Sequence, residues 1–271
     1  MDAAPACLQR AYGPADLQPL LLASGIVATV LVQAAPTVAE TEHLLDIADA
    51  TPSVAGVVGW IDFNLPVERV VLDRLASHAR LVGVRPTVQD LSNDDWVLRP
   101  NLAWAFAAVQ ELGLGFDALG YPRHASRFLA LCQRYPDLRV VLDHGLKPAI
   151  AARSFERWAA DMRDLAQHSQ ACCKLSGLAT EAAPGDSIQA LRPYVEHLVD
   201  VFGAERLMWG SDWPVSSSAI GYREWLQGCE ELLAPLGRDA NALIFGGNAT
   251  AFYRLTPPPA CGTGAQQPSN S

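Results

Sequence analysis

Seven short apolar runs recur along the chain, and their spacing restricts the fold more than any other feature of the sequence. Most of them are continuously hydrophobic, which is typical of strands buried on both faces of a parallel sheet. Their starts lie roughly 25 to 35 residues apart, the length of a βα unit. The runs cover residues 25–33, 54–62, 81–85, 112–119, 138–144, 172–178 and 206–212.

Amphipathic helical segments separate these runs, as a βα repeat requires. They cover residues 39–50, 66–79, 124–135, 154–168 and 188–202. The pattern predicts an α/β fold, a TIM-like (β/α) barrel with seven recognisable strands. The first barrel strand is missing from this count, because residues 8–25 have the pattern of a loop followed by a helix.

An open, doubly wound sheet is the alternative architecture, and it needs no eighth strand. The sequence contains no Gly-rich phosphate loop of the GxGxxG or GxxxxGK type that would support it. A length of 271 residues suits one barrel. We therefore expect a single, N-terminally incomplete barrel domain over residues 1–255 and a disordered tail over residues 256–271, rich in Pro, Gly, Gln and Ser.

Composition limits the partners and the location that the sequence predicts. A formal net charge of -9 argues against a nucleic-acid surface, and no apolar run is long enough to span a membrane. We expect a small acidic or sugar-derived substrate and a cytoplasmic protein, whose scattered cysteines are reduced core residues. Whether the chain forms a homo-oligomer stays open.

Ionisable side chains fall at or near the ends of the apolar runs, where side chains of a (β/α) barrel converge on the active site. Asp212 and His144 each follow a buried strand. Such a carboxylate can take a proton from water or bind a metal, or simply cap a turn, and a single histidine is more often structural than catalytic. Two strands that end this way favour a site. The full set is Asp62, Arg85, Asp117, Asp143, His144, Lys174 and Asp212.

Basic residues at strand ends have two interpretations as well. Lys174 and Arg85 either hold a substrate carboxylate or stabilise an oxyanion, or they point outward. Lys147 is expected to be a surface loop residue. Ser176 lies outside any GxSxG motif and is not expected to be a nucleophile. The histidines on helical segments are expected to be solvated: His43, His78, His168 and His197.

Several segments together resemble the amidohydrolase superfamily, in particular its amidohydrolase-related, lactonase-like branch, which includes sugar-lactone and 2-pyrone-4,6-dicarboxylate lactonases. The resemblance covers roughly residues 8–255, and its most specific parts are "CKLSGL" and "GSDWPV". It implies a distorted barrel that hydrolyses a cyclic ester. By this resemblance Asp212 activates water, His144 polarises the carbonyl, and Lys174, Arg85 and Trp213 bind substrate. Some relatives bind a divalent metal such as zinc, and others work without one.

The sequence also departs from this family's pattern. Relatives carry a His-x-His pair on the first strand, and no such pair occurs here; Pro86 stands where a histidine usually follows "GVR". Only His144 and Asp212 then remain as metal ligands, too few for a typical catalytic zinc, so metal binding stays unknown. The predicted function is hydrolysis of a sugar or pyrone lactone. A truncated or degenerate non-catalytic barrel that binds a ligand and a metal-dependent decarboxylase are the alternatives.

Overall fold

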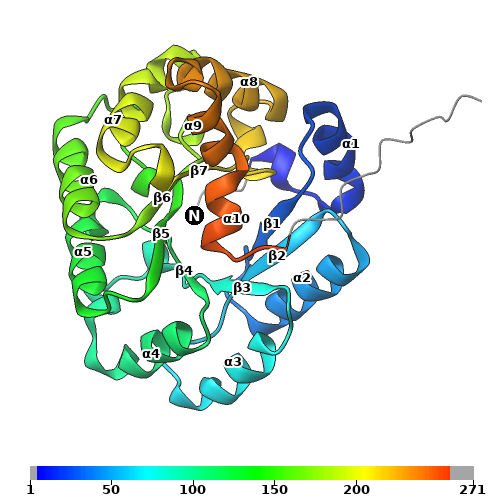
Figure 1. The fold of residues 1–271 in the computed structure, drawn as a ribbon, viewed down its shortest axis with the longest axis vertical. Helices are drawn as coiled ribbons and strands as arrows, with labels where there is room; N and C mark the ends of the chain where they lie inside the picture. The colour runs from blue at the N-terminus through cyan, green and yellow to red at the C-terminus, as the bar shows by residue number, and fades with distance from the viewer. Residues whose placement is uncertain (1–4, 257–271) are drawn as a thin grey trace, which may run out of the picture.

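Seven parallel strands form the centre of the molecule (Figure 1). The structure is a computed structural model, and it describes residues 5–256. The strands lie in chain order, each hydrogen-bonded to the next, and all neighbours are parallel. Within the described residues, β1 and β7 do not pair with each other. The strands are β1 (Thr29–Val32), β2 (Val54–Gly59), β3 (Leu81–Val84), β4 (Gly115–Ala118), β5 (Arg139–Leu142), β6 (Cys172–Leu175) and β7 (Leu207–Trp209).

Helices surround the strands on the outside, because each parallel connection must cross over to the next strand. The predicted TIM-like barrel with seven strands is therefore confirmed. The α-helices are α1 (Pro14–Ser24), α2 (Val38–Ala50), α3 (Arg69–Ala76), α4 (Ala103–Glu111), α5 (Ala125–Arg134), α6 (Glu156–His168), α7 (Arg192–Phe202), α8 (Tyr222–Leu233), α9 (Arg238–Ala242) and α10 (Asn248–Phe252).

Two of the predicted helices begin with a tighter turn. The segment 66–79 starts as a 3-10 helix (Pro66–Glu68) before α3, and the segment 188–202 starts as a 3-10 helix (Ile188–Leu191) before α7. A 3-10 turn is common at a helix terminus, where backbone groups lack an α-helical partner.

The core has two layers, one between strands and helices and one inside the ring of strands. The outer layer joins the inner faces of the helices to the strands. Inside the ring, Val58, Val82, Val141 and Met208 pack against Phe252 and Tyr253 at the C-terminal end of the chain. The barrel interior is thus filled by side chains, as in other barrels of this size.

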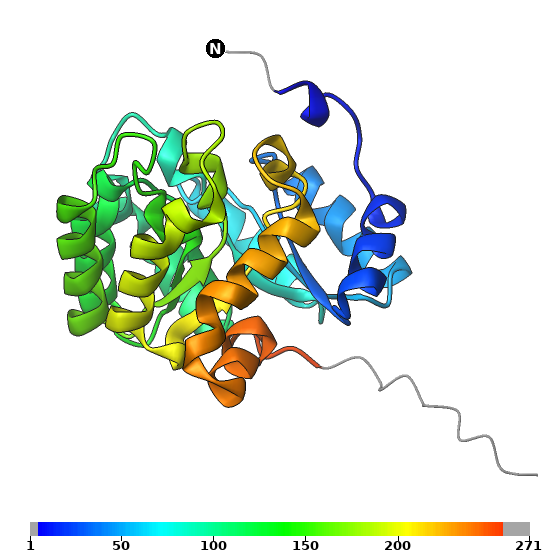
Figure 2. The same cartoon turned by 90° about the horizontal axis from the view of Figure 1, so that it is seen from above.

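Helix α10 and the following Tyr253 cover the barrel at the amino ends of the strands (Figure 2). Arg139, the first residue of β5, donates hydrogen bonds to the backbone oxygens of Phe252 and Gly113. The ring of Phe252 lies so close to Gly115 that a Cβ there would approach it to 2.8 Å. Glycine at the start of β4 therefore lets the C-terminal aromatic ring enter the barrel.

Several expectations about single residues and segments are resolved by this packing. His197 is buried on α7, where its Nε2 lies 2.8 Å from the Ala159 oxygen of α6, so the expectation that it is solvated is wrong. The inner face of α7 packs on α6, and the imidazole of His197 therefore lies against the ring of Trp158. His43 and His168 are exposed, and His78 pairs with Asp49.

Three further expectations concern the whole chain. The cysteines of the described residues are free thiols. No helix among residues 5–256 is long and apolar enough to cross a membrane. The tail predicted to be disordered lies outside the described residues, apart from Thr256.

Candidate active site

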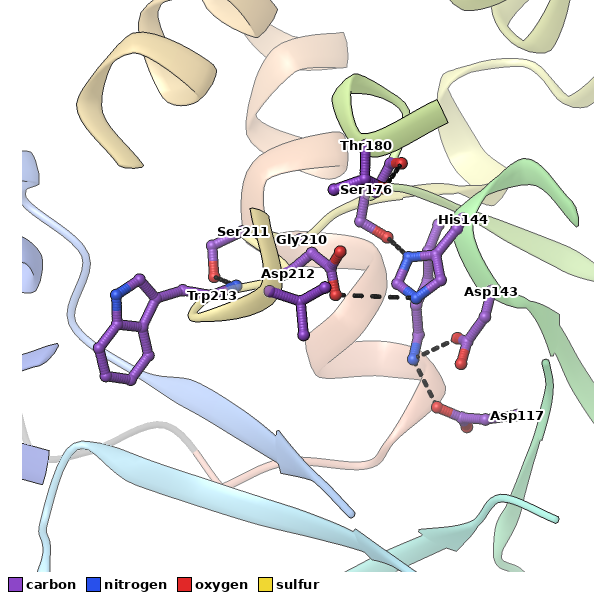
Figure 3. Close-up of polar contacts among 12 residues, drawn as sticks. Asp117, Asp143, His144, Ser176, Thr180, Gly210, Ser211, Asp212 and Trp213 are labelled. Carbon is purple, nitrogen blue, oxygen red and sulfur yellow. Dashed lines mark hydrogen bonds and ion pairs between the residues drawn. The ribbon is translucent and has the colours of Figure 1, made fainter. Parts of the chain in front are cut away.

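Polar side chains that follow β5, β6 and β7 meet at the carboxyl ends of these strands (Figure 3). Asp212, which follows β7, places Oδ1 3.8 Å from Nε2 of His144, which follows β5. Ser176, directly after β6, lies on the other side of the His144 ring. Parallel strands bring their carboxyl ends to one edge, so residues far apart in sequence meet there.

The backbone is left-handed at both members of the Asp212–His144 pair. Asp212 has φ +52°, and four consecutive residues from His144 to Lys147 have φ between +52° and +57°. Only one of those four, Gly145, is a glycine. A left-handed residue with a Cβ costs roughly 1–2 kcal/mol. Strain of this kind concentrates at functional sites, where the surrounding structure holds it.

Ser176 fixes the orientation of the His144 ring. Its Oγ lies 2.8 Å from His144 Nδ1, and Ser176 itself is buried. When the serine hydroxyl donates to Nδ1, the ring proton resides on Nε2, the nitrogen that faces Asp212. Gly177 makes room for this arrangement, because a Cβ there would lie 2.7 Å from Nδ1.

Burial shifts the two ionisable groups of the pair in opposite directions. It lowers the pKa of His144 to about 3, so the imidazole is neutral near pH 7. It raises the pKa of Asp212 to about 6. Among the charges that act against this rise, Lys147 lowers the pKa of Asp212 most, ahead of Arg85 and Lys174. Asp212 is therefore ionised near neutral pH and more basic than an exposed carboxylate.

A second cluster of charges lies deeper in the barrel, beside this pair. The Nζ of Lys174 lies 2.5 Å from Asp117 Oδ2 and 2.7 Å from Asp143 Oδ1. Arg85 pairs with the other oxygen of Asp143 at 3.0 Å. The hydroxyl of Tyr253 donates to Asp117 Oδ2 at 2.7 Å. Two cations and two carboxylates thus balance each other in a buried, formally neutral network.

The pKa directions in this network follow from mutual pairing. Burial by itself lowers the pKa of Lys174, but the two carboxylates outweigh burial and hold it well above its ordinary value. Burial likewise raises the pKa of Asp143, but Lys174 and Arg85 bring it below its ordinary value. Burial raises the pKa of Asp117. Lys174 is therefore an ammonium ion held by two acidic side chains.

Arg85 is held on its other side by the end of β1. Its guanidinium donates to the backbone oxygen of Gln33, and the Gln33 side chain donates to the backbone oxygen of Arg85 at 2.7 Å. The structure thus places both predicted substrate-binding cations, Lys174 and Arg85, against protein groups. Their roles toward substrate stay predictions.

Comparison with known proteins identifies the family. The sequence profile of the amidohydrolase family (Amidohydro_2) matches residues 3–255. An L-fucono-1,5-lactonase of Burkholderia ambifaria is 47% identical over 255 residues, which cover 93% of this chain and 88% of that protein. An L-fucono-1,5-lactonase of Burkholderia multivorans is 34% identical, with the same coverage. The chain belongs to the amidohydrolase family.

Solved structures agree with the fold of this amidohydrolase. A crystal structure of an amidohydrolase from Burkholderia multivorans with bound zinc superposes with a TM-score of 0.88 at 33% identity, covering 93% of each chain. A probable 2-pyrone-4,6-dicarboxylic acid hydrolase from Acinetobacter baumannii superposes with a TM-score of 0.74 at 18% identity, covering 93% of this chain and 94% of that one. The second likeness shows the fold alone.

The residues of this amidohydrolase do not fit the zinc that the relative binds. Within residues 5–256, no group of three or more His, Cys, Asp or Glu side chains is placed to hold a metal ion. His144 and Asp212 supply two potential ligands, whereas catalytic zinc sites use three protein ligands. We therefore derive no step of the reaction through a metal.

The structure places Trp213 apart from the Asp212–His144 pair. Its ring packs edge-on against Tyr12, with 5.1 Å between ring centroids, and points away from His144 (Figure 3). A role for Trp213 in substrate binding stays a prediction. Lys147, expected to be a surface loop residue, is instead half-buried and acts electrostatically on both Asp212 and His144.

Two site residues are beyond what sequence reasoning assigned. The sequence excludes Ser176 only as a nucleophile, although its position directly after β6 is a signal for contact with the neighbouring strand end. Tyr253 lies in a C-terminal stretch without a strand pattern, and nothing in the sequence shows that it enters the barrel to reach Asp117. Asp117 itself carries a signal, since it is a carboxylate inside an apolar run.

Proposed function

We propose that this amidohydrolase hydrolyses a sugar lactone of the L-fucono-1,5-lactone type, with Asp212 as the general base. The observation that carries the proposal is the Asp212–His144 pair, in which a carboxylate with a pKa of about 6 faces a neutral imidazole at the mouth of the barrel. The lactonases of the two Burkholderia species support the reaction class.

Ester hydrolysis needs a base that removes a proton from water as the water oxygen attacks the carbonyl carbon. Asp212 fits this role because burial makes it a stronger base while it stays ionised near pH 7. The neutral His144 can donate a hydrogen bond from Nε2–H to the carbonyl oxygen and keep its proton, since Ser176 orients the ring. Collapse of the tetrahedral intermediate then breaks the ring C–O bond, and the leaving oxygen takes the proton from Asp212.

The charge balance favours a neutral sugar lactone over a pyrone dicarboxylate. A dianionic substrate requires cations to receive its carboxylates. At the strand ends of this chain, Lys174 and Arg85 are already paired with Asp117 and Asp143, which leaves one lysine, Lys147, for two substrate carboxylates. An uncharged lactone needs no such partners, and hydrogen bonds suffice for its hydroxyl groups.

The test is the variant Asp212→Asn, assayed with a panel of aldono-1,5-lactones and 2-pyrone-4,6-dicarboxylate. Loss of the base should lower kcat by about 10²–10⁴-fold on an accepted lactone. The matched control is Asp62→Asn, because Asp62 follows β2 and accepts hydrogen bonds only from the nearby Asn64. Unchanged turnover in Asp212→Asn would remove Asp212 from the base role. A wild-type protein that hydrolyses none of the lactones would overturn the function.

A further inference from the structure

Only two of the 20 basic residues of this chain are lysines, and both lie at the ends of neighbouring strands. Every other basic position is an arginine. Lys174 is the second-last residue of β6, and its ammonium group forms ion pairs with the buried Asp117 and Asp143. Lys147 lies in the turn after β5, three residues beyond His144. Lys147 is therefore the lysine at the mouth of the barrel, outside the buried network.

Lys147 differs from Lys174 in having no partner of opposite charge. Among residues 5–256, no carboxylate lies within 4.0 Å of its Nζ. The Nζ instead lies 5.6 Å from the centre of the Tyr121 ring, a distance at which a cation is attracted to the aromatic face. The half-buried Glu181 is the other carboxylate besides Asp212 whose pKa Lys147 lowers, and it too is beyond ion-pair distance.

The backbone at Lys147 ties it to the catalytic histidine. Its N–H donates to the His144 oxygen at 2.8 Å, within the left-handed turn that runs from His144 to Lys147. A lysine has no intrinsic reason to adopt φ +52°, which costs roughly 1–2 kcal/mol. The strain is consistent with a position that is held for function.

We propose that Lys147 is a catalytic residue of this amidohydrolase, which binds the negative charge that forms on the lactone carbonyl oxygen and then the carboxylate of the product. The proposal rests on the lactonase function proposed above. An ammonium group that has no carboxylate partner among residues 5–256, and that lies in the same left-handed turn as His144, is placed to meet an anion that forms during the reaction.

The charge that Lys147 meets follows from the reaction itself. As water attacks, its proton passes to Asp212, a C–O bond forms, and the π electrons of the carbonyl move to its oxygen. The oxyanion then re-forms the carbonyl as the ring C–O bond breaks, and the proton on Asp212 passes to the leaving oxygen. The hydroxy acid so formed releases one proton to solvent and becomes a carboxylate. A negative charge thus forms twice on the oxygens of the same carbon, first in the tetrahedral intermediate and then in the product carboxylate, so one cation can serve both stages.

Lysine suits this task better than the arginine that the chain uses elsewhere. The ammonium is a compact point charge on a flexible stem, whereas guanidinium is a planar group suited to binding a carboxylate in two places. A single carbonyl oxygen that gains and loses charge matches a point charge. The ammonium is also strongly hydrated, so water can replace the product carboxylate at Nζ and let the product leave.

The first test compares Lys147→Met with Lys147→Arg on an accepted lactone. Removal of the charge should lower kcat by about 10²–10³-fold with a smaller change in KM, and Lys147→Arg should restore part of it. The acidic limb of the pH–rate profile should also move to higher pH in Lys147→Met, because a cation that lowers the pKa of Asp212 has been removed. The matched control is Arg153→Met, an exposed cation of the same loop that also has positive φ and pairs with Asp186.

The second test uses the presence of only two lysines. Reductive methylation followed by peptide mass spectrometry should label Lys147, leave Lys174 unlabelled, and lose the Lys147 label when the aldonate product is present. A wild-type protein that hydrolyses lactones, combined with unchanged kcat in Lys147→Met or labelling that the product does not affect, would overturn the role of Lys147 alone. A wild-type protein without lactonase activity would overturn the proposed function instead.

Discussion

The two charged clusters at the carboxyl ends of the strands are built from similar residues but differ in balance. In the buried network, Lys174 and Arg85 face Asp117 and Asp143, and each charge has a partner. At the mouth, Asp212 faces a neutral His144 and feels the charge of Lys147, which has no carboxylate partner within the described part of the chain. The clusters adjoin through neighbouring residues, Asp143 and His144.

The two clusters differ in what they can offer a substrate. A charge that is already paired has little free energy to offer a substrate, because binding would require its partner to be displaced. Burial has raised the pKa of Asp212, which suits it to proton transfer, and a cation without a carboxylate partner is available to bind an anion. We therefore expect loss of a charge in the network to affect mainly folding, and loss of a charge at the mouth to affect mainly the proposed reaction.

Replacing each lysine by methionine should affect the stability of the protein very differently in the two clusters. Lys174→Met leaves Asp117 and Asp143 buried without their shared cation, and we expect the free energy of unfolding to fall by about 3–5 kcal/mol. Lys147→Met should lower it by about 1 kcal/mol or less, since no ion pair is lost. Urea unfolding measures both. Equal losses in the two variants would mean that the clusters do not differ as described.

The pH dependence of the wild-type enzyme sharpens the account of the mouth. The base must be ionised to act, so kcat/KM should rise with pH up to about 6 and then level off. Two pH units below that value, at about pH 4, activity should be roughly a hundredfold lower, because each unit protonates ten times more of the carboxylate. Lactones also hydrolyse spontaneously, so the uncatalysed rate is subtracted. Circular dichroism at pH 4 separates lost ionisation from unfolding, and a flat profile in folded protein would exclude Asp212 as the titrating base.

Ser176→Ala tests the link between the two strands at the mouth. Loss of the hydrogen bond to His144 Nδ1 should free the ring and lower kcat by about two- to twelvefold, since such a bond contributes about 0.5–1.5 kcal/mol. The control is Ser218→Ala, which removes an exposed hydroxyl bonded only to the nearby Val215 oxygen. Steady-state kinetics with one lactone compares them. Identical kcat values in the two variants would show that Ser176 does not orient the histidine.

Much of the fold could be predicted from the sequence, because each buried parallel strand is a continuous hydrophobic run of neighbouring residues. Continuous apolar runs such as 138–144 and 206–212 coincide with β5 and β7, and the amphipathic segments between strands form the expected helices. The positions of His144 and Asp212 after these strands follow from the same pattern. The packing of Tyr253 inside the barrel has no such local pattern, since its hydroxyl bonds to Asp117, 136 positions away in the sequence.

The order of the strands, the family and the edge of the barrel at which polar side chains gather can all be predicted from the sequence. Only the tertiary structure decided which of those side chains are paired. Lys174 and Lys147 look alike in sequence, each a cation near a strand end, yet one is enclosed by two carboxylates and the other has none within 4.0 Å among residues 5–256. The physical reason is that charge compensation depends on distances between strands, and these are set only when the barrel closes around its core.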